Sequence, residues 1–297
     1  MKKKTHRLDR IRSQFPLHLM LLPGVLLVLI FNYVPMAGIV MAFEKFSPKK
    51  GIFGSQWVGW ENFKYLLNMP DIDKVIWNTF FISGLKLLLG VLVPAAVAVL
   101  INEIRAGWYK KTVQTIIYFP HFLSWVILSG IFIDILSPST GIVNGFLKAI
   151  GLDPVFFLGN EKWFPYTMAL TDTWKEFGYG TIVYLAAIAG IDPTLYEAAE
   201  VDGASKGKQF FKITLPMLSP TTFYLCIVRL IAAFKAFSAI NIMGSGGNAP
   251  SLVTEIYANA FTSYKFGYAS AEAWVLVAVI LVVTAIQFWG QKKWVHY

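Results

Sequence analysis

The sequence contains few of the residues from which catalytic and metal centres are built. It has one cysteine, Cys226, within a long apolar stretch, so neither a disulfide framework nor a cysteine-based metal site is possible within the chain. Its four histidines form no H-E-x-x-H pair and are scattered at His6, His18, His121 and His296. No cluster has the spacing of metal ligands, and "GSGG" is not a serine-centred nucleophile elbow. We therefore expect no catalytic residues and no bound metal.

Charged residues are also scarce, at 14% of the chain against about a quarter in ordinary soluble domains. Hydrophobic residues make up 56% and gather in blocks long enough to cross a bilayer, which takes roughly 20 residues. Each block predicts a helix, because backbone polar groups in lipid need internal partners and the blocks are too long for transmembrane strands. The expected fold is an all-α polytopic membrane domain over 18–290, with six spans at about 18–42, 76–101, 113–136, 164–190, 221–241 and 273–290.

The lysines and arginines predict the orientation of these spans. Six of them fall in the first twelve residues. The apolar stretch after the basic segment 1–17 has no small-residue cleavage site, so we expect a retained first span rather than a removed leader. Fourteen lie in segments on one side of the spans and eight on the other, which places both termini, including the tail 291–297, in the cytoplasm. The basic excess is then a topology signal, and nucleic-acid binding is disfavoured.

The external segments are expected to contain local structure. The first, 43–75, carries aromatic residues suited to a membrane interface or a small folded cap in "WVGWENFKYLL". The second, 137–163, predicts a short amphipathic helix over 142–150 between two turn signals. The third, 242–272, opens with the Gly-rich turn "GSGGNAP" and continues as a partly helical re-entry.

The one substantial cytoplasmic segment is 192–220. Asp192 is placed to cap a helix that begins with Pro193, and Gly203 is a natural stop because glycine tolerates the left-handed conformation. A second amphipathic piece, "KGKQFFKITL", then leads to two prolines before the fifth span. The small and acidic residues of the first helix suit docking against a basic partner surface. The alternative is a helix resting on lipid headgroups, although such helices prefer lysine and arginine.

This segment also carries a specific resemblance. From 197 to 216 the chain reads Glu-Ala-Ala, three residues, Gly, nine residues, Ile, one residue and Leu-Pro, the spacing of the cytoplasmic loop of ABC importer permeases. "WVGWENF", "GSGGNAP" and "FGYASAEA" look like external loops of the sugar-importing branch. The chain thus resembles the type I, maltose-transporter-like permeases for oligosaccharides. Within them it looks closer to permeases that import complex polysaccharide fragments in Gram-positive bacteria.

The resemblance implies a subunit of a larger machine in the bacterial cytoplasmic membrane. Its partners would be a second homologous permease, two ATPase subunits and an extracellular solute-binding protein, and its substrate an oligosaccharide, with acidic polysaccharide fragments as one class. ATP and Mg would bind to the ATPase subunits, because this chain has no G-x-x-x-x-G-K-[ST] phosphate loop. The chain itself is expected not to be an enzyme and to work by alternating access.

By the same resemblance, the short helix of 192–220 docks in a groove of an ATPase subunit. Glu197 would form an ion pair there, and Gly203 would make the turn after the helix. The residues expected to couple ATPase motion to the spans are Glu197, Ala198, Ala199, Asp202, Gly203, Ile213, Leu215 and Pro216.

Charged residues inside the spans are candidates for a substrate path, since each costs about 2.5–3.5 kcal/mol on insertion scales. Asp172, Lys175, Glu176 and Tyr179 share one face of the fourth span, and the antiparallel fifth span brings Arg229 to a similar depth. They would form either a sugar-binding wall or only an ion-pair network between helices. When the chain is aligned on the Glu-Ala-Ala segment, the maltose-type contacts fall on this face, but nearly all except the tyrosine differ. The predicted path is Asp172, Lys175, Glu176, Tyr179, Arg229, Ala233 and Ala236.

Other polar and aromatic side chains in the spans are harder to assign. The fifth span also contributes Lys235, and the second contains Lys86, for which the sequence indicates no partner. The third span carries "YFPHFLSW", in which Phe119, His121, Phe122 and Trp125 could line the same path, although ordinary packing and an interface belt are favoured for each.

Two other classes of function fit less well. A transporter driven by an ion gradient would use the buried carboxylates as proton sites, but such folds usually have internal repeats and none is visible. An integral membrane enzyme would need a catalytic constellation that the sequence does not provide.

Overall fold

The chain folds almost entirely into helices. A computed structural model describes residues 2–105, 107–236, 238–244 and 250–294. Within these ranges the strands form a single antiparallel hairpin, β1 (Glu44–Lys45) with β2 (Gln56–Trp57). The prediction of an all-α chain is confirmed. Most of the predicted Gly-rich turn and the last residues of the tail lie outside the described ranges.

The helices are given in chain order, with η marking a 3-10 or π turn. The first half of the chain contains α1 (Lys2–Val28), η1 (Leu29–Tyr33), η2 (Val34–Phe43), α2 (Gly51–Gly54), α3 (Glu61–Leu67), α4 (Ile72–Asn102), α5 (Gly107–Tyr118), η3 (Phe119–Phe122), α6 (Trp125–Ile135) and α7 (Ile142–Ala149). The second half contains α8 (Phe164–Ala189), α9 (Pro193–Val201), α10 (Lys206–Gln209), η4 (Phe210–Thr214), α11 (Leu215–Met217), α12 (Ser219–Phe234), α13 (Ser238–Gly244), α14 (Leu252–Tyr257), η5 (Ala258–Thr262) and α15 (Phe266–Trp294).

Up to six membrane crossings fit this order of helices. Three described segments are long and apolar enough to cross by themselves: Gln14–Phe43, Ile72–Asn102 and Phe266–Gln291. Three more crossings result if each pair of helices joined by a sharp bend counts as one, namely α5 and η3 with α6, α8 with α9, and α10 to α11 with α12. Each predicted span therefore has a helical counterpart, with shifted ends.

The span predicted at 113–136 is not one continuous helix. The chain bends by 100° between η3 and α6. Pro120 has no N–H group to continue a helix, and Leu123 and Ser124 adopt extended backbone. Ser124 then caps α6 by accepting a hydrogen bond from the amide of Ile127. The bend brings η3 against α8.

The fifth and sixth predicted spans also have different ends. The fifth, 221–241, is interrupted where α12 ends at Phe234, and α13 starts afresh. The sixth, 273–290, begins seven residues earlier in the structure, at Phe266, because "FGYASAEA" belongs to the same helix. Outside the spans, α7 occupies the predicted helix at 142–150, and α14 with η5 forms the helical part of the third external segment.

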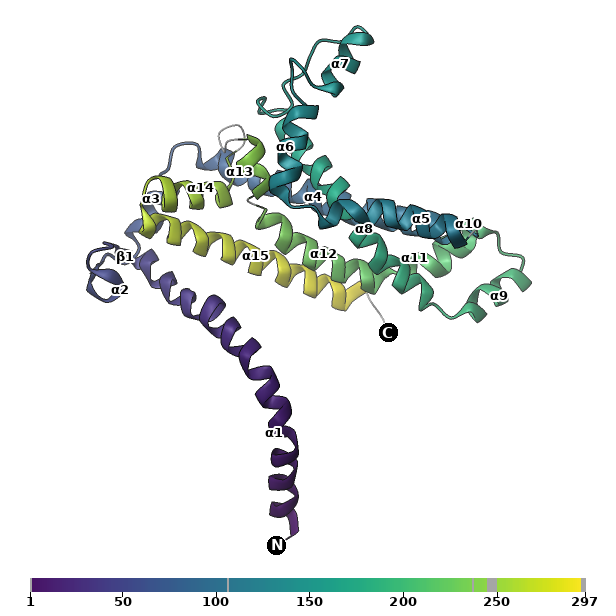
Figure 1. Cartoon of the computed structure of the whole chain (residues 1–297), viewed down its shortest axis with the longest axis horizontal. Coiled ribbons are helices and arrows are strands. Elements are labelled where there is room, and N and C mark those ends of the chain that lie inside the picture. Colours follow the sequence, from purple (N-terminus) through teal and green to yellow (C-terminus); the bar gives the residue numbers. More distant parts are fainter. Residues whose placement is uncertain (1, 106, 237, 245–249, 295–297) are drawn as a thin grey trace.

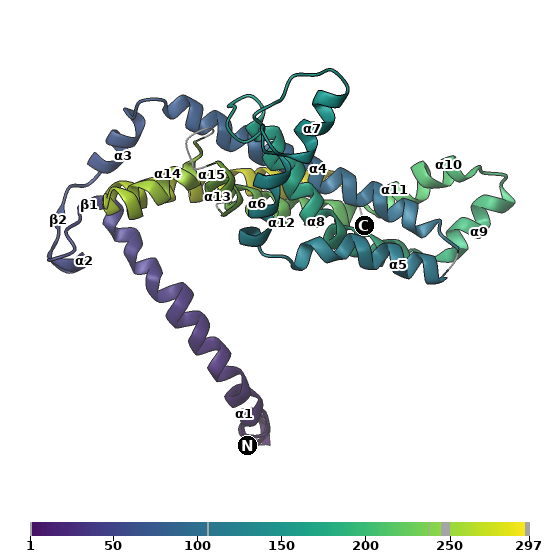
Figure 2. The same cartoon turned by 45° about the horizontal axis from the view of Figure 1, so that its top comes forward.

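The long helices form a bundle from which α1 and α7 project (Figure 1). α4 packs chiefly against α8 and α12, while α15 packs against η2, α14, α12 and α3. α1 extends away from the bundle in both views, and α7 projects from another side (Figure 2). Both views place the β1–β2 hairpin at one end of the molecule and α9 at the opposite end. This separation agrees with a chain whose 43–75 and 192–220 segments face opposite sides of a membrane.

The interface of α4, α8 and α12 is anchored by Tyr184, whose side chain is fully buried. The ring packs in a cluster with Ala98 of α4 and Leu225 of α12. Its hydroxyl donates a hydrogen bond of 3.1 Å to Oγ1 of Thr222, so the buried phenol is satisfied. The three helices are thereby held in one register close to the cytoplasmic segment.

A close crossing between α5 and α8 depends on Gly178. A Cβ atom at this position would overlap the backbone carbonyl of Ile117, and backbone cannot move aside as a flexible side chain can. Small residues allow helices to approach in this way inside membranes.

We predict that Gly178→Ala will destabilise the chain by about 1–3 kcal/mol, the usual cost of overpacking. The measurement is the melting temperature of the detergent-purified protein by size-exclusion chromatography after heating. The control is Gly84→Ala on α4, where an added Cβ meets open space. Equal melting temperatures for the two variants would show that α5 and α8 do not cross at this glycine.

Candidate functional site

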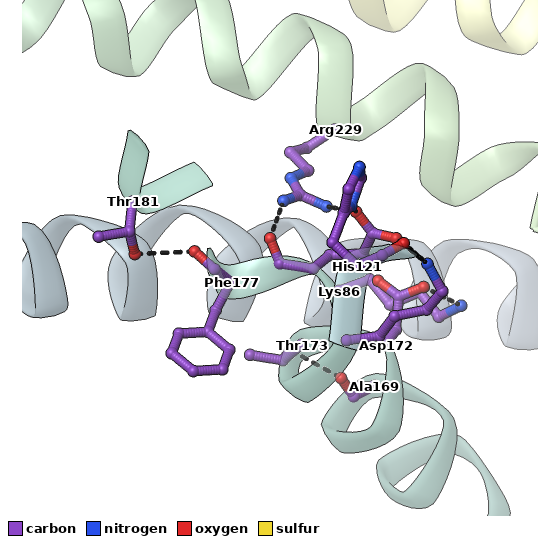
Figure 3. A network of polar contacts seen from close by, with 10 residues as sticks. Lys86, His121, Ala169, Asp172, Thr173, Phe177, Thr181 and Arg229 are labelled. Carbon is purple, nitrogen blue, oxygen red and sulfur yellow. Dashed lines mark hydrogen bonds and ion pairs between the residues drawn. The ribbon is translucent and has the colours of Figure 1, made fainter. Parts of the chain in front are cut away.

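A cluster of charged side chains lies where α4, α8, α12 and η3 meet (Figure 3). α8 supplies Asp172, Lys175 and Glu176, which fall within about one helical turn of each other. α12 supplies Arg229, and η3 supplies His121, which the bend after η3 holds near α8.

Glu176 is the centre of this cluster. Its Oε1 accepts a hydrogen bond of 2.9 Å from Lys175 Nζ, and its Oε2 lies 2.8 Å from Nδ1 of His121 and 3.7 Å from the guanidinium of Arg229. Arg229 also donates a 2.7 Å hydrogen bond to the backbone carbonyl of Glu176. One carboxylate therefore ties α8, α12 and η3 together, and the predicted proximity of Glu176 and Arg229 is confirmed.

A second ion pair joins α4 to α8. Nζ of Lys86 lies 3.3 Å from Oδ1 of Asp172, and the lysine side chain is almost fully buried. The sequence left Lys86 unassigned because its partner is 86 residues away along the chain. Only the packing of α4 against α8 brings the two together.

A cavity of about 290 Å³ opens beside these ion pairs. Five residues of the predicted path line it, together with five residues outside that set. The predicted ones are Asp172, Glu176, Arg229, Ala233 and Ala236, and the others are Lys86, Trp125, Ala232, Lys235 and Ala239. The small alanines of α12 and the start of α13 leave the space that the charged groups face.

Two residues of the predicted path lie outside the cavity lining. Lys175 is buried behind it, where it donates to Glu176 and, at 2.8 Å, to the backbone carbonyl of His121. The ring of Tyr179 is about half exposed and stacks on His121, with centroids 4.8 Å apart and planes 14° from parallel. Trp125 and His121, interpreted from the sequence as ordinary packing, both belong to the site. Helical periodicity could not select these two residues, because a bend of 100° separates η3 from α6.

The charges on the cavity wall do not balance. Glu176 lies near the ammonium of Lys175 and the guanidinium of Arg229, and Asp172 is paired with Lys86. Lys235, the cap residue of α12, is exposed and has no ion pair or hydrogen bond to its ammonium group within the described residues. The cavity can therefore bind an anionic group without breaking an existing pair. The described residues contain no group of three potential His, Cys, Asp or Glu metal ligands.

The segment 192–220 forms the predicted helix, turn and second helical piece. Asp192 caps α9 by accepting a 2.9 Å hydrogen bond from the amide of Thr194, and this bond lowers the pKa of the Asp192 carboxyl below its usual range. Gly203 has φ of 71°, the left-handed conformation expected at the end of the helix. α10, η4 and α11 then lead into α12.

The residues of the predicted coupling set are placed on and beyond α9. Glu197, Ala198 and Asp202 are exposed, and Ala199 is half-buried. Neighbouring Glu200 forms an exposed ion pair of 2.7 Å with Lys206, which joins α9 to α10. Glu197 has no part in this pair and is exposed. Ile213 is half-buried in η4, and Leu215 and Pro216 are exposed in α11. The predicted coupling residues therefore form a continuous surface only on α9 and on the turn at Gly203.

Comparison with known proteins gives this arrangement a family. Residues 82–295 match the model of the binding-protein-dependent transport system inner membrane component. The polygalacturonan/rhamnogalacturonan transport system permease protein YteP of Bacillus subtilis is 36% identical over 288 residues, covering 96% of this chain and 90% of that protein. The protein LplB of the same organism is 35% identical over 275 residues, covering 91% of this chain and 86% of that protein.

Solved structures agree with the sequence comparison. A chain of a bacterial ABC transporter involved in the import of the acidic polysaccharide alginate superposes with a TM-score of 0.86 and 37% identity, covering 97% of this chain and 99% of that one. A second match, with a TM-score of 0.85 and 37% identity, covers 96% of each chain; it comes from the alginate transporter in complex with its periplasmic protein bound to an alginate pentasaccharide. The chain belongs to the family of binding-protein-dependent ABC transporter inner membrane components, the permease subunits.

Proposed function

We propose that this permease subunit carries acidic oligosaccharides across the cytoplasmic membrane by alternating access. It forms a pore with a second, homologous permease and receives the sugar from an extracellular solute-binding protein. Two separate ATPase subunits bind ATP and Mg and drive the cycle. Both termini face the cytoplasm, so α9 lies on the ATPase side and the β1–β2 hairpin and α7 lie outside.

The observation that carries the substrate class is the excess of positive charge around the central cavity. Its wall holds Lys86, Arg229 and Lys235 against two carboxylates, and Lys175 lies directly behind. Because Glu176 and Asp172 are already paired, Lys235 remains for a ligand carboxylate. Trp125, which also lines the cavity and lies under the Lys175 ammonium at 5.8 Å, offers an aromatic surface to the apolar face of a sugar ring. YteP belongs to a polygalacturonan/rhamnogalacturonan transport system, and the alginate transporter imports an acidic polysaccharide, which supports the same class.

The coupling role follows from the position of α9. A bend of 65° connects it directly to α8, the helix that carries Asp172 and Glu176. A rigid-body shift of an ATPase subunit bound to α9 would therefore be transmitted along α8 to the cavity. Glu197 faces outward and is free for an ion pair with a basic group of that subunit. The remaining residues of the proposed coupling surface are Ala198, Ala199, Asp202, Gly203, Ile213, Leu215 and Pro216.

We predict that Lys235→Ala will lower uptake of an acidic oligosaccharide about tenfold, because a hydrogen bond to a charged group contributes about 1.5–3 kcal/mol. The measurement is ATP-dependent uptake of trigalacturonate by proteoliposomes that contain the full complex and its binding protein, with cellotriose as the neutral comparison. Lys235→Arg keeps the charge and should retain uptake. Equal loss for acidic and neutral sugars, or no loss for either, would contradict the substrate class.

We predict that Glu197→Ala will weaken association with the ATPase subunits at least about tenfold, since removing one partner of an interfacial charge pair costs about 2–5 kcal/mol. Co-purification and substrate-stimulated ATP hydrolysis measure the effect. The control is Glu61→Gln, an exposed glutamate on α3 in the external segment. Unchanged association and ATPase activity would mean that α9 rests on lipid rather than on an ATPase.

A further inference from the structure

A larger cavity, of about 950 Å³, lies at the external end of α4. It is formed by three external segments that are far apart in the sequence, around residues 71–78, 160–162 and 250. None of the residues in the proposed substrate path belongs to it. We call it the outer cavity, in distinction from the central cavity beside Glu176.

The lining of the outer cavity combines a flat aromatic ring with planar amides. The ring of Trp77 is two-thirds exposed, and Phe81 stacks on it at 5.9 Å with planes 13° apart, which fixes its orientation. Asn160 accepts a hydrogen bond from the amide of Lys162 through Oδ1, and its NH2 group has no partner in the part of the chain that the structure describes. An aromatic face for the apolar side of a ring, with amide donors at its edge for hydroxyls, suits a sugar.

The outer cavity has an excess of one negative charge, from three carboxylates and two lysines, whereas the wall of the central cavity has an excess of one positive charge. Asp71 and Lys74 form an ion pair of 3.0 Å, and the negative charge of Glu161 also attracts the Lys74 ammonium group. Asp73 and Lys162 complete the charged lining. Such a wall gives no strong preference for an anionic ligand, so it would recognise sugar rings and hydroxyls rather than carboxylates.

A row of residues on α4 leads from the outer cavity to the central one. Lys74, Asn78, Ile82 and Lys86 recur at four-residue steps, so neighbours in this row contact each other while the row winds by about 120° around the helix. The first two line the outer cavity, and Lys86 lines the central one. Ile82 lies between them in a constriction of about 10 Å³, which has room for about one water molecule. The distance from Asn78 to Lys86 is about 12 Å at 1.5 Å per residue.

The constriction is closed by the segment that follows the Gly-rich turn. Asn78 donates a hydrogen bond of 3.2 Å to the carbonyl of Pro250, and the amide of Leu252 donates one of 2.9 Å to Oγ1 of Thr79. Ala233 and Ala236 line both the constriction and the central cavity. The constriction thus adjoins the central cavity, and it shares no lining residue with the outer cavity.

We infer that the outer cavity is a saccharide-binding subsite in which Trp77 holds sugar units released outside before they pass the constriction to the central cavity. This inference rests on the proposed import of oligosaccharides. Because the subsite recognises rings rather than charge, it acts on neutral and acidic chains alike, and selection for acidic sugars occurs afterwards at Lys235. A sugar that is not held there returns to the outside, so ATP is hydrolysed without import.

The test is the number of sugar molecules imported per ATP hydrolysed by the complete complex with its binding protein in proteoliposomes. Trp77→Ala should lower this ratio about threefold to tenfold for both radiolabelled trigalacturonate and cellotriose, the factor expected from losing one aromatic contact. Trp77→Phe, which keeps a flat ring, should retain most of the ratio. Asn160→Asp keeps the Oδ1 cap on Lys162 but removes the amide donors, and should lower the ratio in the same direction without any risk to the bundle.

The control is Trp57→Ala, which removes an exposed tryptophan of the external hairpin outside the cavity and should leave the ratio unchanged. An unchanged ratio for both Trp77→Ala and Asn160→Asp would overturn the inference. A higher concentration of binding protein for half-maximal ATPase stimulation, with a normal ratio, would overturn it too and assign Trp77 to protein docking. If the unsubstituted complex imported neither sugar, the proposed function itself would fail.

Discussion

The arrangement of the bundle depends on one buried carboxylate. Charged groups in a membrane protein are costly unless they are paired, and Glu176 satisfies Lys175, His121 and Arg229 at once. These partners come from α8, η3 and α12, so the cost of each charge is offset only when the three elements meet in one geometry. The same contacts hold α12 with its alanines toward α4 and α8. The space that these small side chains leave is the central cavity. The residues that the sequence offered as a sugar-binding wall are therefore also the residues of the ion-pair network.

The position of Glu176 also connects the two ends of the proposed machine. It lies 13 residues before the end of α8, about 20 Å along a helix, and α9 follows after a short bend. On the other side, α4 joins the network through Lys86 and runs outward past the constriction to the outer cavity. α4 and α8 pack tightly against one another over their length, so displacement of the cytoplasmic end has a rigid route to both cavities. Under the proposed function, α4 and α8 transmit the motion of the ATPase subunits, and the sugar moves along the surface of these two helices.

Much of the fold was predictable from local sequence because apolar blocks in lipid have few alternatives to a helix. Local sequence predicted the six spans and the short helix α7. It also predicted where α9 begins and ends in the segment 192–220 and the second helical piece that follows. The breaks inside spans were missed, as at Pro120 and Lys235, because hydropathy is continuous across them. In the second case the interruption gives Lys235 its exposed place on the cavity wall, which a continuous helix would not.

By itself, the sequence determined the membrane-spanning class, the helical face that carries Asp172, Lys175 and Glu176, and the segment from Glu197 to Pro216 that carries the family's spacing. All of these depend on periodicity or spacing within one stretch of chain. Only the tertiary structure decided that Lys86 pairs with Asp172, that His121 and Trp125 belong to the site and that Lys175 lies behind the cavity rather than on its wall. It also decided that residues of α4 line two separate cavities. These facts depend on contacts between residues tens of positions apart, and such contacts exist only once helices of fixed length have packed.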